Sequence, residues 1–345
     1  MKARPRLTGN RVTATVQYAI VVLCLVTNQI PSNLQAADNP FGFIETRSQS
    51  PVQQLRCGPI HHVPWVIPAD TYTLSIRHNW KNMWLYRHDI CRIDAEVHEV
   101  ITRLRIGLGR GLEIEGELPV RYVSGGIMDG LIEGFHDSFN IDNAGRDDFP
   151  RDDFAFNIRN GSGDDGWSHS GAEQTGWNLG NATLALSFDV GTIASIKPRL
   201  IMTLGLKFPT GTRTEFFGNQ SMDITLSMSG GINVGSLHWY ASSAVSYYGD
   251  KKMIGIKLRQ WRISNLVGLE YKGEKSNHAW TAQILHENGV AHNYDVFSDA
   301  TYEVMFGYQC RLFPRVLMEF SILENVFIFD NSPDFGFHTA LTHSL

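Results

Sequence analysis

The sequence predicts an all-β protein: a transmembrane antiparallel β-barrel of about twelve strands, with one short helical segment in a long extracellular loop or in the lumen. Apolar and polar residues alternate with a period of two along most of the chain, as half-buried strands require. The apolar faces often end in aromatic residues, and tight connections alternate with long ones. These three patterns together are typical of barrels that cross a bacterial outer membrane.

The composition excludes several other classes. Of the 345 residues, 43% are hydrophobic and only 19% are charged, which is too apolar for a disordered chain. The longest apolar run, Tyr18 to Val26, falls short of the roughly 18 residues that a membrane-spanning helix needs. A helical membrane protein is therefore excluded, and the many glycine and aromatic residues favour strands and turns.

The N-terminal residues 1–37 have the pattern of a secretory signal peptide. Four basic residues and no acidic ones precede an apolar segment at 12–26. The stretch Leu34 to Ala37 then offers small residues at which a signal peptidase could cut. A lipoprotein signal at Cys24 stays open, although the bulky Leu23 argues against it. The remaining alternative is a frayed basic tail on a soluble protein.

The mature chain is predicted to begin near Asp38, with a periplasmic or plug segment at 38–69 and the barrel at 70–345. Removing the four basic residues of the leader leaves 26 Lys and Arg against 35 Asp and Glu, a net charge of −9. Such an acidic exported chain is a poor nucleic-acid binder, so no nucleic-acid partner is expected. The three remaining cysteines are an odd and scattered set, so neither a disulfide framework nor a zinc site is expected.

The strands follow from the period-two pattern in chain order. In the first strand, Tyr72, Leu74 and Ile76 share one face while Thr73 and Ser75 lie on the other. The same alternation recurs at 112–122, 183–190, 199–208, 222–229, 261–271 and 301–311. A soluble two-sheet protein would alternate in the same way, and it is the main alternative to the barrel.

Aromatic ends and connection lengths favour the barrel. The aromatic residues that match interfacial girdles are Tyr72, Trp80, Tyr122, Phe208, Trp261 and Tyr271. Tight links at 109–111, 235–236 and 313–314 alternate with longer links at 124–176, 210–219 and 288–299. Short links are then periplasmic turns and long links extracellular loops, and the expected location is the cell outer membrane.

The last strand, 334–341, approximates the terminal signal that the barrel-assembly machinery reads, although the chain ends in Leu345 rather than Phe. That machinery is accordingly an expected partner, together with outer-membrane lipid and lipopolysaccharide.

The polar faces of the strands would line the lumen. If Gly109-Arg110-Gly111 is a three-residue hairpin loop, Leu108 pairs with Leu112. Arg105 then lies opposite Glu115 and Arg103 opposite Glu117, and each such pair contributes roughly 0.2–1 kcal/mol. The predicted charged lining also includes Arg77, Glu113, Arg121, Arg199, Lys207, Glu270, Glu303, Arg311 and Glu319. This charge is either a structural ladder that braces the wall or a charged path that screens solutes. A lumen of this size should be narrow and partly plugged.

The long connection at 124–177 begins with a change of period from two to helical. Gly125 and Gly126 would let the chain turn away from the strand. A short helix from near residue 127 would then place Asp129, Glu133 and His136 on one polar face. These three could bind a divalent ion or serve acid–base chemistry, or they could hydrogen-bond to the barrel wall, which is the favoured interpretation.

The stretch 137–165 that follows the predicted helix is acidic and is expected to be a solvated surface loop. Calcium bridging through Asn160, Asp164 and Asp165 is a weak alternative, because the spaced calcium-loop motif is absent. No cofactor is expected.

The block Gly125–His136, together with Ile93–Glu96, Leu112–Pro119 and Arg146, resembles a family of uncharacterised outer-membrane proteins of Gram-negative bacteria, known only as a domain of unknown function. The resemblance runs from about Asn39 to the C-terminus and implies fold and location, but no mechanism. Lys207-Phe208-Pro209-Thr210-Gly211 is similar to a strand-end motif in several outer-membrane barrels linked to uptake of aromatic or apolar compounds.

The leading functional expectation is a narrow channel or transport barrel for an unidentified small solute, with residues 125–139 folded into its mouth or lumen. An outer-membrane lipid-modifying enzyme is the first alternative. It would need a Ser–His pair, and although Ser138 lies near His136, no Gly-x-Ser-x-Gly element occurs. A structural or adhesive barrel acting through the acidic loop is the second alternative.

Overall fold

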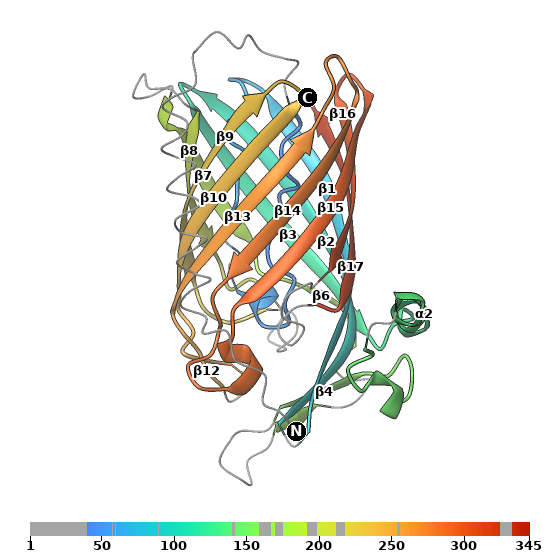
Figure 1. The fold of residues 1–345 in the computed structure, drawn as a ribbon. Coiled ribbons are helices and arrows are strands. Elements are labelled where there is room, and N and C mark those ends of the chain that lie inside the picture. The colour runs from blue at the N-terminus through green and yellow to red at the C-terminus, as the bar shows by residue number, and fades with distance from the viewer. Residues whose placement is uncertain are drawn as a thin grey trace.

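Twelve antiparallel strands close into a barrel (Figure 1). The computed structural model describes residues 40–56, 58, 60–88, 90–139, 142–158, 167–169, 175–191, 199–211, 218–253, 256–324 and 333–345. Within these ranges, no helix is both long and apolar enough to cross a membrane. The barrel strands are β1 (Tyr72–Arg87), β2 (Cys91–Gly109), β3 (Leu112–Ser124), β7 (Thr183–Asp189), β8 (Leu200–Lys207), β9 (Asp223–Val234), β10 (Leu237–Tyr248), β13 (Trp261–Tyr271), β14 (His278–Glu287), β15 (Thr301–Phe313), β16 (Val316–Glu324) and β17 (Phe335–Ser344). Each pairs with its neighbours in chain order, and β1 pairs with β17 to close the ring. The predicted twelve-stranded barrel is confirmed.

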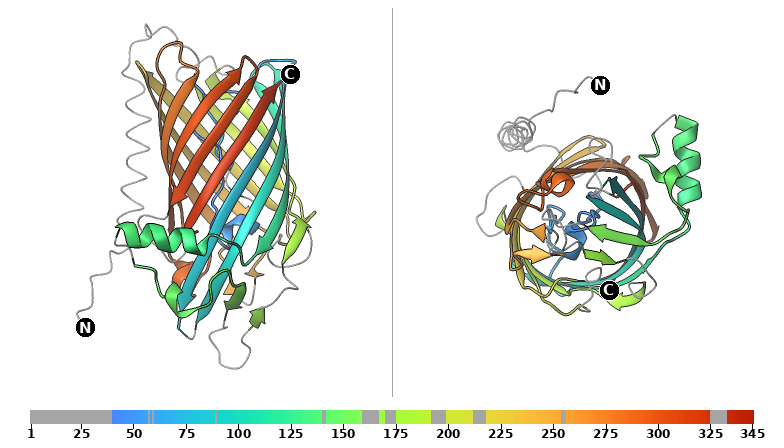
Figure 2. Two further views of the ribbon diagram at one scale, coloured as in Figure 1. Left: turned by 90° about the vertical axis from the view of Figure 1, so that its right-hand side faces the viewer. Right: turned by 90° about the horizontal axis from the view of Figure 1, so that it is seen from below.

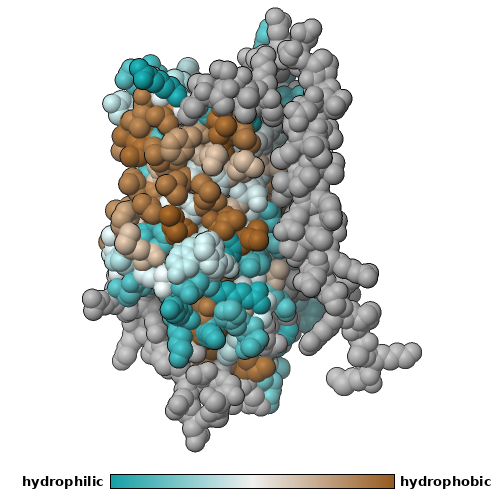
Figure 3. Space-filling model, turned by 90° about the vertical axis from the view of Figure 1, so that its left-hand side faces the viewer, coloured by the Kyte–Doolittle hydropathy of each residue, from teal (hydrophilic) through white to brown (hydrophobic). Residues whose placement is uncertain are grey.

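The strands point apolar side chains outward and polar side chains inward. In β9, Ile224, Leu226 and Met228 are exposed, whereas the intervening Thr225 and Ser227 are buried. Figure 3 shows the result on one side of the molecule: apolar atoms cover the strands, and polar atoms gather toward the end with the long connections. An apolar outer surface of this extent is stable only against lipid.

The two ends of the barrel differ. Tight turns such as Arg110–Gly111 and Gly235–Ser236 lie at one end, near the C-terminus (Figure 1). In the first turn, positive φ angles at Gly109, Arg110 and Gly111 form the tight reversal. The rule for outer-membrane barrels assigns this end to the periplasm. The other, extracellular end carries β4 (Ala155–Ile158), β5 (Trp167–His169), β6 (Gly176–Leu179), β11 (Lys252–Met253), β12 (Ile256–Lys257), α2 (Asp129–Phe139), η3 (Arg146–Asp148) and η5 (Asp295–Ser298).

The helix α2 lies outside the barrel wall (Figure 2). Glu96 of β2 accepts hydrogen bonds from the backbone N–H groups of Ile127 (2.9 Å) and Met128 (3.0 Å), just before the helix begins. A Cβ at Gly126, where φ is +87°, would overlap the Glu96 carboxylate. Of the two positions expected for this helix, the loop position is therefore correct and the lumen position is wrong. The physical reason is that Glu96 points away from the lumen.

The lumen instead contains residues 40–69, hereafter the luminal segment, whose residues 57 and 59 lie outside the described ranges. Figure 2, seen from below, shows this part of the chain, including η2 (Gln53–Leu55), inside the ring of strands. Its side chains are largely buried.

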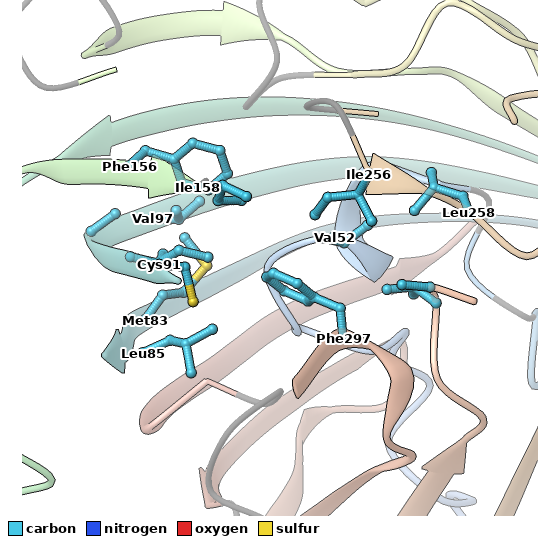
Figure 4. Packing of buried hydrophobic residues seen from close by; sticks show 14 of the residues in the cluster. Val52, Met83, Leu85, Cys91, Val97, Phe156, Ile158, Ile256, Leu258 and Phe297 are labelled. Atoms are coloured by element: carbon cyan, nitrogen blue, oxygen red, sulfur yellow. The ribbon is translucent and has the colours of Figure 1, made fainter. Parts of the chain in front are cut away.

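An apolar cap closes the extracellular end of the lumen (Figure 4). Here the inward side chains of β1 and β2 change from polar to apolar and pack around Val52 of the luminal segment. The cap comprises Val52, Met83, Leu85, Cys91, Ile93, Ala95, Val97, Val123, Phe156, Ile158, Ile256, Leu258, Val290, Ala291 and Phe297. It joins the luminal segment to the strands and to the extracellular connections in one core.

Candidate functional site: the filled lumen

The first half of the luminal segment runs from the periplasmic end toward the cap and is held by polar side chains of the wall. The Glu270 carboxylate accepts hydrogen bonds from the N–H groups of Phe41 and Gly42, both at 2.9 Å. Farther in, Gln283 accepts from the N–H of Ile44 and donates to its carbonyl oxygen, again at 2.9 Å each. A buried backbone without regular secondary structure needs such partners.

The path continues to Arg56 near the extracellular end. The Glu303 carboxylate accepts a hydrogen bond from the N–H of Gln49 (3.0 Å). The Arg56 guanidinium then lies 3.7 Å from the centre of the Tyr248 ring and 3.3 Å from the Asp250 carboxylate. The segment thus spans the length of the lumen before it turns back.

The second half returns to the start of β1 along a different part of the wall. The His61 ring is held between the hydroxyl groups of Ser242 (2.8 Å) and Ser264 (2.9 Å). His62 Nε2 lies 2.9 Å from the Glu113 carboxylate, which also accepts a hydrogen bond from the N–H of Ile67 at 2.8 Å. Both legs of the segment are therefore fixed to the strands by side chains.

Glycine residues in the wall make room for the luminal segment. A Cβ at Gly107 in β2 would overlap the carbonyl oxygen of Pro68, and a Cβ at Gly307 in β15 would overlap the side chain of Ile44. Because Pro68 contributes backbone here, a side chain at 107 could not be accommodated by a rotamer change. The wall is shaped around its occupant.

The charged ladder of β2 and β3 has the predicted register, with Arg105 opposite Glu115 and Arg103 opposite Glu117. The closest side-chain contacts are diagonal: Arg105 donates to Glu113 (2.6 Å) and Arg103 to Glu115. The predicted pairing of Leu108 with Leu112 is wrong, because Leu108 is an extra residue in a bulge and Gly109 pairs with Leu112.

The ladder also binds the luminal segment. Glu45 bridges Arg77 (3.2 Å) and Arg103, and Arg121 donates to both Glu99 (2.8 Å) and the carbonyl oxygen of Gln54 (2.6 Å). The remaining predicted lining residues Lys207, Glu303 and Glu319 are also buried, while Arg199 and Arg311 are exposed at the periplasmic end. In these contacts the charges pair with one another and hold the segment.

Three carboxylate and imidazole groups of this cluster lie close enough to suggest a metal site. Ligand atoms of His62, Glu113 and Glu115 fall within 4.8 Å of one another. Arg105 donates to Glu113 and lies 2.8 Å from His62 Nε2, and Arg103 donates to Glu115. Because guanidinium groups already supply the positive charge, the geometry fits a buried ion-pair cluster better than a cation site.

The three residues predicted to form the polar face of this helix each contact a different partner. Asp129 contacts Asn82 (3.2 Å) and Arg146, Glu133 contacts Arg151 (2.5 Å), and His136 Nδ1 lies 3.0 Å from Asn143 Oδ1. Asp129, Glu133 and His136 therefore do not converge on a common point.

Two further expectations fall in this loop: the Ser138–His136 pair and a calcium site. Partial desolvation and the neighbouring carboxylates raise the pKa of Asp152 above its ordinary value. Ser138 Oγ donates to the carbonyl oxygen of Gly134 (2.7 Å) rather than to His136. The suggested calcium ligands Asn160, Asp164 and Asp165 lie outside the described residues.

The luminal residues that carry most of these contacts were not singled out from the sequence. They are Phe41, Glu45, Arg56, His61, His62 and Trp65. The available signal was indirect: glycine at inward positions of several strands, which indicates close approach by another part of the chain.

Comparisons with known proteins agree with the barrel. A family described as "Protein of unknown function (DUF3187)" matches residues 18–345. The COG4313 outer membrane channel from Pseudomonas putida F1 is 11% identical, with a TM-score of 0.53 over 81% of this chain and 97% of that chain. The NanC porin is 8% identical, with a TM-score of 0.45 over 79% of this chain and 100% of that chain. The P. putida toluene transporter TodX is 11% identical, with a TM-score of 0.39 over 80% of this chain and 90% of that chain. No curated protein matches the chain. The first likeness shows a shared fold with an outer-membrane barrel.

Proposed function

The chain belongs to the family of proteins of unknown function DUF3187, and we propose that it is a narrow outer-membrane channel for small solutes, held closed by its own luminal segment. The fold supports a channel, since it is shared with an outer-membrane channel of known structure. The luminal segment and the apolar cap together fill the interior in the structure described above.

One observation carries the proposal: the luminal segment is attached to the wall through side chains and does not pair as a strand in its described part. Its N–H groups bond to the carboxylates of Glu270, Glu303 and Glu113, and to the amide of Gln283. The barrel is closed independently by the β1–β17 ladder. The segment can therefore leave the lumen without breaking a barrel strand.

Planar-bilayer recording of the full-length protein tests the proposal. A variant whose residues 43–66 are replaced by a Gly-Ser linker of equal length should show discrete conductance, well above that of the wild type. Deletion of residues 125–139 is the matched control, because α2 lies outside the wall and its loss should leave the lumen filled.

A gel shift between boiled and unboiled samples confirms that each variant has folded as a barrel. If a folded linker variant is as silent as the wild type, or if deletion of 125–139 opens the barrel equally, the proposal fails.

A further inference from the structure

A cavity of about 510 Å³ lies at the periplasmic end of the lumen, between the two legs of the luminal segment and the wall. Its rim includes Pro314 and Arg315 of the β15–β16 turn and Ser344 near the C-terminus. The apolar cap closes the opposite end of the lumen. The cavity is therefore reached from the periplasm, and its volume is in the usual range for small-molecule sites.

The lining of this cavity is strongly basic, although the mature chain is acidic. Among the described residues, six arginines and only two glutamates contribute to it. Arg77, Arg103 and Arg105 are neutralised by the ion pairs described above. The other three are Arg199, Arg311 and Arg315. They are exposed, and none of them has a carboxylate of a described residue within 4.0 Å.

Aromatic and aliphatic side chains of the luminal segment form another part of the lining. Phe41, Phe43 and Trp65 contribute rings, and Phe41 lies 5.0 Å from the Arg311 guanidinium. A guanidinium group offers a planar pair of donors that matches a carboxylate, and rings offer a flat apolar contact. The two kinds of group are combined in one cavity.

We propose that this cavity binds a small amphipathic carboxylate, of the aryl carboxylate class, from the periplasmic side. The carboxylate lies at Arg311 and Arg315, and its ring packs against Phe41 and Trp65. The inference rests on the proposed function only where it names the solute of that channel. The binding itself can be measured in the absence of conduction.

Calorimetric titration of the full-length protein in phosphatidylcholine nanodiscs tests the site, with empty discs subtracted. The probe is 2-naphthoate. Its neutral analogue 2-naphthamide keeps the ring without the charge, and acetate keeps the charge without the ring. Naphthoate should bind at least about tenfold more tightly than either analogue, since each lacks one of the two interactions.

Variants locate the binding. Arg311→Gln combined with Arg315→Gln should weaken naphthoate binding at least about tenfold, whereas Trp65→Leu should weaken naphthoate and naphthamide alike. Arg110→Gln is the matched control, because Arg110 lies in another periplasmic turn and does not line the cavity. Absence of naphthoate binding, equal binding of acetate, or equal loss in Arg110→Gln would overturn the site. A folded linker variant that stays silent in bilayers, alongside intact naphthoate binding by the wild type, would overturn only the channel.

A second inference rests on the polarity of α2, which is inverted relative to a helix on a soluble protein. The exposed fractions of Ile127, just before the helix, and of Leu131 are 73% and 55%, whereas those of Asp129, Glu133 and His136 are below 10%. The helix thus turns these last three side chains toward the protein, together with Ile132, and presents an apolar edge at Leu131 and Phe135 to the outside.

The apolar edge of α2 continues the apolar surface of the barrel. The Phe135 ring lies 6.2 Å from that of Phe335 on β17, which lies 5.0 Å from Phe337, and Phe337 lies 5.7 Å from Trp80. We infer that α2 lies in the plane of the membrane, with Ile127, Leu131 and Phe135 among the acyl chains of the outer leaflet.

Spin-label accessibility tests this placement in proteoliposomes, in a chain whose native cysteines are replaced by alanine. A nitroxide at Leu131→Cys should be reached better by oxygen than by a nickel chelate, as in lipid. A nitroxide at Asp137→Cys, on the exposed but acidic edge of the same helix, should show the opposite preference. Greater nickel accessibility at position 131 would overturn the inference.

Discussion

The contact between Glu270 and the start of the luminal segment offers a direct test of what keeps the lumen filled. The Glu270 carboxylate is fully buried and accepts hydrogen bonds from the N–H groups of Phe41 and Gly42 and from the Tyr240 hydroxyl (2.6 Å). In Glu270→Gln, the side chain keeps its size but loses its charge. Its NH2 group also faces a backbone N–H donor of the luminal segment, where the carboxylate offered an acceptor oxygen.

The expected magnitude follows from these bonds. Hydrogen bonds to a charged group contribute about 1.5–3 kcal/mol each, and the amide can retain at most one weaker bond to the segment. The free energy of opening the periplasmic end of the segment should fall by about 2–4 kcal/mol. The open form of the segment should then be about 30- to 1000-fold more populated than in the wild type.

Hydrogen exchange measures this opening at the amides of Phe41 and Gly42, whose protection should fall by that factor, and open events in planar bilayers should become more frequent. Glu319→Gln is the matched control, because the Glu319 carboxylate is also buried and accepts from Gln309 of the neighbouring strand (2.8 Å). Unchanged protection in Glu270→Gln, or an equal loss in Glu319→Gln, would refute the reasoning.

Three further changes have definite expected outcomes. Gly107→Ala should displace the luminal segment at Pro68 and raise conductance while the barrel still shifts on a gel, whereas Gly116→Ala, where a Cβ meets open space, should do neither. Arg105→Gln should destabilise the barrel by about 3–5 kcal/mol in denaturant titrations by removing the guanidinium that pairs with the buried Glu113, and the double variant with Glu113→Gln should recover part of that loss. Arg146→Ala should release the loop that carries α2, seen as faster proteolysis of that loop with an intact barrel, and an unchanged cleavage rate would contradict this.

The strands and their register were predictable because each depends on residues close in sequence. Alternation places Arg103 and Arg105 on the inward face, and a tight turn at Arg110 sets their partners across β2 and β3. The sequence could not predict the bulge at Leu108 or the diagonal contacts between side chains. Both depend on how the strands twist and bend, which the alternation of residues does not encode.

Of the two positions expected for α2, the lumen position was wrong because the outward-facing partners of the helix are not evident from the alternation of residues. The strands β1 and β2 extend together to Arg87 and Cys91, beyond the rest of the wall at the extracellular end (Figure 1). This extension carries Asn82 and Glu96, the groups that bind Asp129 and the start of the helix. A polar helix face in a barrel loop therefore does not by itself indicate the lumen.

The position of the luminal segment was harder still to predict from the sequence, because the residues that bind it are far away along the chain. Phe41 and Glu270 are separated by 229 residues, and the segment itself has neither a strand nor a helix period. What the sequence does contain is the complementary signal in the wall, such as Gly205 and Gly307 at inward positions of otherwise regular strands. Glycine weakens a strand, so its presence there calls for a reason such as close packing.

The same alternation that places apolar residues against lipid also accounts for the filled lumen. In a barrel wider than an eight-stranded one, inward side chains cannot reach across and satisfy one another. Buried carboxylates such as Glu270 and Glu303 then need donors from elsewhere, and the backbone of the luminal segment supplies them. The polar contacts of the luminal segment can be replaced by water or solute at a modest cost, whereas its packing in the apolar cap at Val52 cannot. For the channel proposed above, such a polar lining would let one barrel be both well ordered when closed and able to open.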